Sequence, residues 1–122
     1  SGRWAVSLMR YGPQLVPQPG TLFRRNAYEE VGGLDYQLKW AFDLDLFIKL
    51  SRLGTTTYVP RTLSKFRWHQ DSLSVSGRTN SVVEASAVRV KALPKPLKSI
   101  SFIWEKPLQV LIRYGGSLVH RF

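Results

Sequence analysis

The residue pattern predicts a small domain, or a piece of a larger one, in which helices are combined with an extended segment. Residues 43–53 form the clearest helical pattern, which Gly54 ends as the C-cap. Residues 79–93 also place apolar side chains at helical spacing. Between these helices, residues 55–68 are rich in β-branched and aromatic residues and are interrupted at Pro60, a composition that favours extended backbone.

The N-terminal third is predicted from its helix breakers and caps. Three prolines and two glycines exclude a regular helix over residues 11–20. Asn26 and Glu29 have the spacing of a capping box, which predicts a helix N-terminus at Asn26. This short helix is expected to end at Gly32 and Gly33, and an irregular loop follows.

The C-terminal part divides into a linker and a helical tail. Residues 93–99 combine prolines with lysines, which is typical of a linker. From residue 100 to residue 122, apolar residues recur at helical spacing, namely Ile100, Ile103, Trp104, Leu108, Leu111 and Ile112. Pro107 is expected to break this helix or to begin a second one. The predicted units are therefore residues 1–92, 93–99 and 100–122.

The amino-acid composition of the chain favours some classes of function and excludes others. The chain of 122 residues has 18 Lys and Arg against 8 Asp and Glu, a formal charge of +10 at pH 7. This surplus favours an anionic partner: nucleic acid, an anionic membrane surface, or the phosphates of a small molecule. The absence of cysteine excludes disulfides, cysteine-ligated zinc and thiol catalysis. The apolar runs fall short of the roughly 18 residues that a membrane-spanning helix needs.

Two carboxylates lie at the start of the helix predicted over residues 43–53. Because successive helical residues are about 100° apart, Asp43 and Asp45 are expected to face nearly opposite ways. Asp43 shares the apolar stripe of the helix, where partial desolvation suits a general base. Asp45 precedes Lys49 by four residues, the spacing of an exposed ion pair. On this local pattern alone, capping of the helix N-terminus is the commoner role for Asp43.

A second chemical pattern covers residues 65–69. If this segment is extended, Lys65, Arg67 and His69 share one side, and the two aromatic residues between them share the other. The first side then offers two cations and an imidazole to an anion or a metal. The alternative is a solvated strand face with a surface histidine.

Four motifs in series give the chain a resemblance to a known family. They are QPGTLFRR at residues 18–25, YEEVGGLD at 28–35, AFDLDLFIKL at 41–50 and FRWH at 66–69. Each motif is weak by itself, but their order and spacing are specific. The chain from about residue 16 to residue 75 resembles the acceptor-side half of a family 2 glycosyltransferase with the GT-A fold. The resemblance implies an α/β fold class, a partial Rossmann-like domain with few strands and flanking helices.

The resemblance implies roles for individual residues. Asp43 matches the general base that deprotonates the acceptor hydroxyl, although Phe42 stands where many relatives carry an acidic residue. Arg67 and His69 match the element near the donor diphosphate, with His69 as a metal ligand. The residues that match the border of the acceptor pocket are Gln18, Pro19, Gly20 and Asp35.

The function implied is that of an inverting glycosyltransferase, which moves a sugar from a nucleotide-sugar donor to a sugar or lipid-linked acceptor in bacterial cell-surface polysaccharide synthesis. The reaction needs a divalent metal, Mg²⁺ or Mn²⁺, whose main ligands are expected in a nucleotide-binding half upstream of Ser1. The chain is then a fragment that transfers little sugar by itself. Its expected location is the cytoplasm, at the inner face of the cell membrane.

Two other interpretations remain open from the sequence. The cations, among them Arg24, Arg61 and Arg89, would supply phosphate contacts in a nucleic-acid-binding module, but they are scattered and no known nucleic-acid-binding motif is present, so this partner is disfavoured. The segment 100–122 could lie on an anionic membrane as a basic amphipathic helix, or it could pack on another part of the protein.

Overall fold

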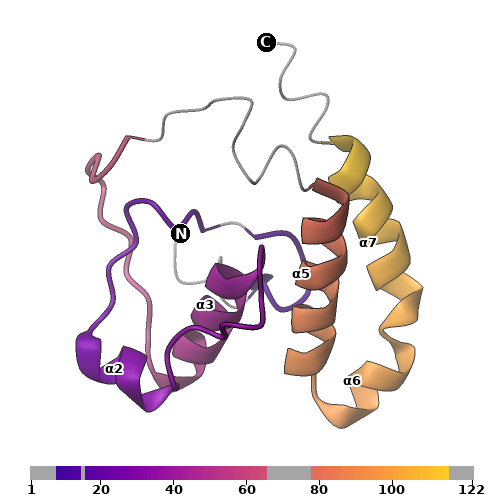
Figure 1. Ribbon diagram of the computed structural model, residues 1–122, viewed down its shortest axis with the longest axis horizontal. Helices are drawn as coiled ribbons and strands as arrows, with labels where there is room; N and C mark the ends of the chain where they lie inside the picture. The colour runs from indigo at the N-terminus through magenta and orange to yellow at the C-terminus, as the bar shows by residue number, and fades with distance from the viewer. Residues whose placement is uncertain (1–7, 15, 66–77, 116–122) are drawn as a thin grey trace.

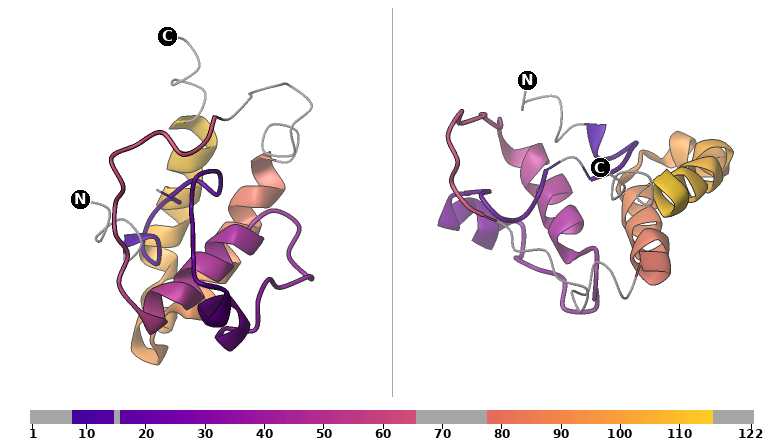
Figure 2. Two further views of the ribbon diagram at one scale, coloured as in Figure 1. Left: turned by 90° about the vertical axis from the view of Figure 1, so that its left-hand side faces the viewer. Right: turned by 90° about the horizontal axis from the view of Figure 1, so that it is seen from above.

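A computed structural model describes residues 8–14, 16–65 and 78–115, and this part of the chain is built from helices. The helices are α2 (Arg25–Glu30), α3 (Phe42–Leu53), α5 (Arg78–Ala92), α6 (Lys95–Ile100) and α7 (Phe102–Gly115). Helix α5 packs against both α3 and α7, and α2 contacts α3, so that the helices follow one another in the order α2, α3, α5, α7 across the molecule (Figures 1 and 2).

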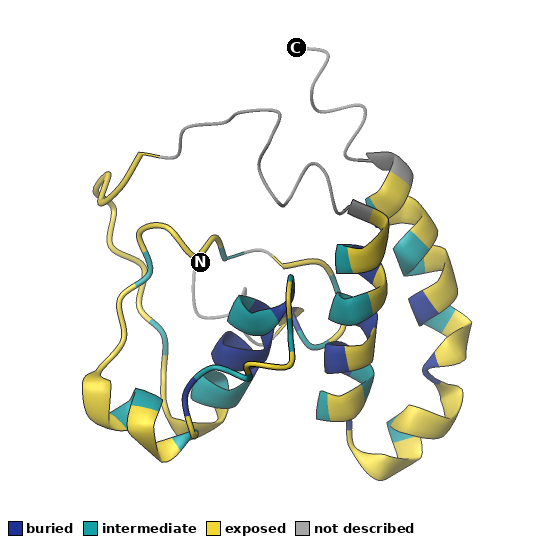
Figure 3. Ribbon diagram, viewed as in Figure 1, coloured by how far each residue is buried: buried dark blue, intermediate teal, exposed yellow. Residues whose placement is uncertain are grey.

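The predicted α/β fold class is wrong for the described residues, which contain no β-strand. Residues 55–65, predicted to be extended, do form a non-helical and largely exposed segment (Figure 3). A strand needs a neighbouring strand to pair its N–H and C=O groups. Within the described ranges no second extended segment pairs with this one, and a β-rich composition alone cannot supply that partner.

The core lies between α3 and α5. Helix α3 confirms the helix predicted over residues 43–53, including its end at Gly54. It buries Leu44, Phe47 and Ile48, because the i, i+3, i+4 spacing puts these side chains on one face. Val88 of α5 completes the cluster from the opposite helix, together with Met9 of the N-terminal segment. The burial of each such side chain contributes about 1.5–3 kcal/mol to the free energy of unfolding.

Helix α2 does not begin with the predicted capping box. The Asn26 Oδ1 atom accepts a hydrogen bond from the N–H of the next residue, Ala27, inside the helix. Glu29 instead pairs with Arg25, its Oε1 atom lying 2.8 Å from Arg25 Nε on the exposed surface. The helix begins one residue before Asn26, with no side-chain cap. The ion pair four residues apart has drawn the Glu29 carboxylate away from the backbone.

The helix predicted over residues 79–93 is confirmed as α5, and the chain beyond it is more helical than expected. Residues 93–99, predicted as a linker, contain most of α6, which begins after Pro94. The expectation that Pro107 breaks the following helix is wrong, since α7 runs through it. Proline removes one backbone hydrogen bond, but Glu105 and Gln109, on either side of Pro107, both bind α5 and hold the two parts of α7 in line.

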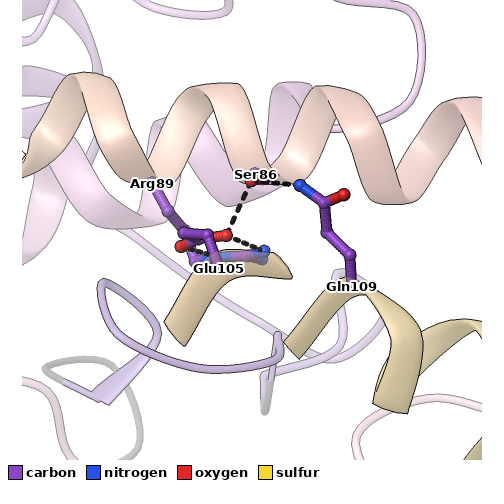
Figure 4. A network of polar contacts seen from close by, with 4 residues as sticks. All are labelled: Ser86, Arg89, Glu105 and Gln109. Atoms are coloured by element: carbon purple, nitrogen blue, oxygen red, sulfur yellow. Dashed lines mark hydrogen bonds and ion pairs between the residues drawn. The ribbon is translucent and has the colours of Figure 1, made fainter. Parts of the chain in front are cut away.

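A buried ion pair joins α5 to α7 (Figure 4). Arg89 and Glu105 are only 1% and 3% exposed. The Arg89 Nε and Nη2 atoms donate to the two oxygens of Glu105 at 3.1 and 3.0 Å. Ser86 Oγ donates to Glu105 Oε2 at 2.6 Å, and Gln109 Nε2 donates to Ser86 Oγ at 2.8 Å. The two buried charges therefore neutralise each other within a connected network.

Removing one charge of this pair is expected to destabilise the fold far more than removing both charges. Glu105→Gln leaves the Arg89 guanidinium buried without a counter-charge, and we expect the free energy of unfolding in urea to fall by about 3–5 kcal/mol. The double variant Arg89→Met/Glu105→Leu should unfold within about 1 kcal/mol of the parent chain or be more stable.

The exposed pair Arg25–Glu29 supplies the control, because Arg25→Ala should change the free energy of unfolding by less than about 0.5 kcal/mol. If Glu105→Gln lowers the free energy of unfolding by no more than Arg25→Ala does, the buried pair does not hold α7 to α5.

Candidate functional site

Two depressions of the described surface meet at the N-terminus of α3. The first, called the cleft, has a volume of about 200 Å³ and is lined by Gln18, Thr21, Phe23, Tyr28, Leu34, Asp43, Leu46 and Phe47. The second, called the groove, has a volume of about 630 Å³, within the range of small-molecule sites. Its borders are residues 13–14, 16–19 and 39–44, one side of α5, and Ile112. Asp43 and Gln18 line both depressions and therefore stand at their junction.

The carboxylate of Asp43 is held by two neutral donors. Gln14 Nε2 donates to Asp43 Oδ2 at 2.7 Å and also to the Val16 carbonyl oxygen at 3.1 Å, which ties it to its own loop. The N–H of Leu44 donates to Asp43 Oδ1 at 2.8 Å. Asp43 is thus not the N-cap, a position that Ala41 occupies. Since each carboxylate oxygen accepts about two hydrogen bonds, both retain capacity for a hydroxyl from the junction.

The second carboxylate of the helix points elsewhere. Asp45 Oδ2 lies 2.6 Å from Lys49 Nζ, the ion pair expected from their spacing. The pair is less exposed than predicted, because Asp45 is 7% exposed. Asp43 and Asp45 therefore have separate partners, in agreement with their 200° separation around the helix axis, and they do not form one site.

An aromatic pair forms one wall of the cleft. The rings of Phe23 and Tyr28 are stacked with their centroids 5.7 Å apart. The Tyr28 hydroxyl accepts a hydrogen bond from the N–H of Leu34 at 3.4 Å and lies against Gly33. A Cβ atom at Gly33 would come within 2.9 Å of that hydroxyl oxygen, and its φ of +68° also favours glycine. The predicted helix end at Gly32 and Gly33 is confirmed, and it shapes this wall.

The predicted acceptor-pocket residues separate into two groups. Gln18 and Pro19 lie at the groove beside Asp43. Gly20 lies in the turn that follows, at a φ of +85°, where a Cβ atom would come within 3.0 Å of Ser64 Oγ. Asp35 lines neither depression; its Oδ1 atom accepts a hydrogen bond from the N–H of Gln37 at 3.0 Å and so forms a turn. Of these four residues, Gln18 and Pro19 line a depression, whereas Gly20 lies against Ser64 and Asp35 closes a turn.

Glu84 of α5 holds the loop that leads into α3, a role that nothing in its local sequence indicates. Its Oε1 atom accepts a hydrogen bond from the N–H of Lys39 at 3.0 Å. Its Oε2 atom accepts from the N–H groups of Trp40 and Ala41 at 2.6 and 2.7 Å. Trp40 and Ala41 border the groove directly before Asp43. A carboxylate 44 residues away along the chain from Trp40 therefore fixes the approach to the site.

Two residues, Arg67 and His69, are predicted to lie near the donor diphosphate. Arg67 and His69 lie outside the described residues. Among the residues that are described, no group of three or more His, Cys, Asp or Glu is placed to hold a metal ion. The described part of the site therefore consists of the residues around Asp43 at the start of α3.

The distribution of cations bears on the nucleic-acid interpretation. Arg89 is buried and its charge is paired with Glu105, although the residue also lines the groove. Arg10 donates to Ser51 Oγ at 2.8 Å, and Lys49 is paired with Asp45. Several of the positive charges counted in the sequence are therefore used inside the protein.

Comparisons with protein-family models, with curated proteins and with solved structures yield no match. Across the described ranges, no helix combines the length and the apolar character that crossing a membrane requires. The assignment of function therefore depends on the site itself.

Stability should depend on the ionised form of Glu84. Burial raises the pKa of this carboxyl, but the hydrogen bonds from the N–H groups of Lys39, Ala41 and Trp40 outweigh burial and the charge of Asp35, so the pKa in the folded protein is lowered. A lowered pKa means that the stabilisation is complete above the unfolded value of about 4.3 and is lost as the pH falls through the folded value.

We expect Glu84→Gln to lower the free energy of unfolding at pH 7 by about 1–3 kcal/mol, because the charged acceptor is lost. The difference from the parent chain should shrink below about pH 4. Urea unfolding from pH 3 to pH 7 measures both, with the exposed Glu30→Gln as control. A difference that is independent of pH would mean that the ionised carboxylate does not hold the loop.

Proposed function

We propose that this chain provides the acceptor-binding part of an inverting glycosyltransferase, in which Asp43 is the general base. The observation that carries the proposal is the position of the Asp43 carboxylate at the junction of the cleft and the groove. The donor is a nucleotide-sugar, and the acceptor is a hydroxyl of a sugar or of a lipid-linked sugar. The resemblance of four sequence motifs to those of family 2 glycosyltransferases is a second argument for the same proposal.

The partners of Asp43 suit a base. In a chain with 18 Lys and Arg, both hydrogen-bond donors that hold Asp43 are uncharged, the Gln14 amide and the N–H of Leu44. These two donors fix the direction of the carboxylate, and each of its oxygens can still accept a hydrogen bond from an acceptor hydroxyl. Gln14 is therefore a positioning residue for Asp43.

The reaction then proceeds in one step. The acceptor hydroxyl donates a hydrogen bond to Asp43, and the proton moves to the carboxylate as the hydroxyl oxygen attacks the anomeric carbon. The bond from that carbon to the diphosphate oxygen breaks on the opposite side, and the electron pair leaves with the nucleoside diphosphate. Attack opposite the leaving group inverts the configuration. A divalent metal, if bound, would neutralise the diphosphate charge; His69, the ligand that the resemblance implies, lies outside the described residues.

The surroundings of Asp43 are suited to a sugar acceptor. The stacked rings of Phe23 and Tyr28 offer an apolar wall, and Trp40 borders the groove. Gln18 places an amide at the junction beside the carboxylate. Mostly apolar walls with a few directed polar groups are typical of small-molecule sites.

Asp43→Asn in the full-length protein should lower kcat for sugar transfer by about 10²–10⁴, because the amide cannot accept the hydroxyl proton. Binding of the nucleotide-sugar, measured by calorimetry, should stay within about twofold, since the base acts on the acceptor. Gln14→Ala should lower kcat by less than Asp43→Asn does.

Asp35→Asn is the matched control, because Asn preserves the turn at Gln37 and the residue lines neither depression. If the Asp43→Asn variant transfers sugar as fast as the Asp35→Asn variant, Asp43 is not the general base. Sub-micromolar binding of DNA or RNA with a steep salt dependence, and no transferase activity, would favour the nucleic-acid interpretation instead.

A further inference from the structure

Helix α7 carries apolar side chains on two opposite faces. Its inner face packs on α5 through Glu105 and Gln109, and the half-buried Leu108 and Ile112 lie on this side. At 100° per residue, Ile103, Val110 and Leu111 point the other way.

These outer residues are exposed, at 61%, 56% and 67% for Ile103, Val110 and Leu111, and the adjoining Phe102 is 62% exposed. The apolar stripe that periodicity predicts over residues 100–112 therefore combines residues from two different faces of α7. Helix α7 lies beside α5 at the end of the helix series, and much of its ribbon is exposed (Figures 1 and 3). An apolar face of this kind without a cover marks a contact with something else.

The charges around this outer face have one sign. From residue 85 to residue 122 the sequence has seven Lys or Arg and a single acidic residue, Glu105. Glu105 is buried and neutralised by Arg89, so it adds nothing to the outer surface. Lys95 and Lys98 of α6 and Lys106 of α7 are exposed. The outer surface of α6 and α7 therefore combines exposed apolar side chains with cations and, within the described residues, has no exposed carboxylate.

We propose that α6 and α7 dock this protein on an anionic membrane surface, with α7 lying parallel to the bilayer plane. Ile103, Val110 and Leu111 insert among the lipid acyl chains near the headgroups, and Lys98 and Lys106 contact anionic headgroups. A helix of 14 residues is about 21 Å long and lies within the interface, as basic amphipathic helices do.

Charge favours this occupant over a second copy of the chain. Two copies joined through the same face would place Lys98 and Lys106 near their own equivalents, and like charges in a contact are repelled. An anionic bilayer supplies the opposite charge and an apolar layer together. The inference stands independently of the proposed function.

The test is sedimentation of the full chain with sucrose-loaded vesicles of phosphatidylcholine alone, or of phosphatidylcholine and phosphatidylglycerol at comparable amounts. We expect binding to the anionic vesicles that weakens with salt, and little binding to the neutral ones. Lys98→Gln/Lys106→Gln should lower partitioning about thirtyfold, at about fivefold per lysine. Val110→Gln/Leu111→Gln should lower it about tenfold or more.

Matched controls change equally exposed residues elsewhere. Leu22→Gln/Tyr36→Ser removes two apolar side chains that are 85% and 93% exposed, and Arg24→Gln/Arg61→Gln removes two cations; neither should alter partitioning by more than about twofold. All changes are at exposed positions, and circular dichroism confirms that the helices persist.

Equal binding to neutral vesicles, or equal losses in the control variants, would overturn the proposal. A dimer seen by light scattering that Val110→Gln/Leu111→Gln dissociates would show that a second copy covers the face, and this too would overturn it.

Discussion

The structure depends on the contact in which the Glu84 carboxylate accepts three backbone N–H groups from the loop before α3. These donors precede a helix whose N-cap, Ala41, has no side-chain acceptor. Glu84 does from α5 what a local Ser or Asp usually does from the cap position. The same contact sets the direction of the first turn of α3 and thereby places Asp43 at the junction of the cleft and the groove.

Helix α5 is also fixed to α7. The Arg89–Glu105 pair connects it to α7 without access to water, so a continuous series of polar contacts runs from α7 through α5 to the loop before Asp43. The protein uses two of its few carboxylates for this purpose, although its net charge is strongly positive. The partners that a third carboxylate, Asp43, has among the described residues are uncharged, in keeping with the general-base role proposed for it.

The sequence predicts those features whose causes are local. Helix α3 and its end at Gly54 follow from apolar spacing and a glycine, and α5 follows in the same way. Gln18 and Asp43 line the same two depressions, and the role that the resemblance implies for them stays a prediction. The opposite directions of Asp43 and Asp45 follow from helix geometry alone.

The features with distant causes were not predictable. Glu84 acts 44 residues away along the chain from Trp40, and the pairing of Arg89 with Glu105 depends on α6 turning the chain back. The α/β class was implied by the family resemblance alone, and the described residues overturn it because residues 55–65 pair with no second extended segment there. Asp35 sits in a family-like motif, but its own side chain closes a turn instead of facing the site.

The most direct test of this account is amide hydrogen exchange of the full chain at residues 39–41, followed by NMR at pH 7. The account predicts that the amides of Lys39, Trp40 and Ala41 are protected in the parent chain. It also predicts that they exchange much faster in Glu84→Gln, while the amides within α5 keep their protection. Equal exchange of these three amides in both proteins would show that Glu84 does not set the position of Asp43.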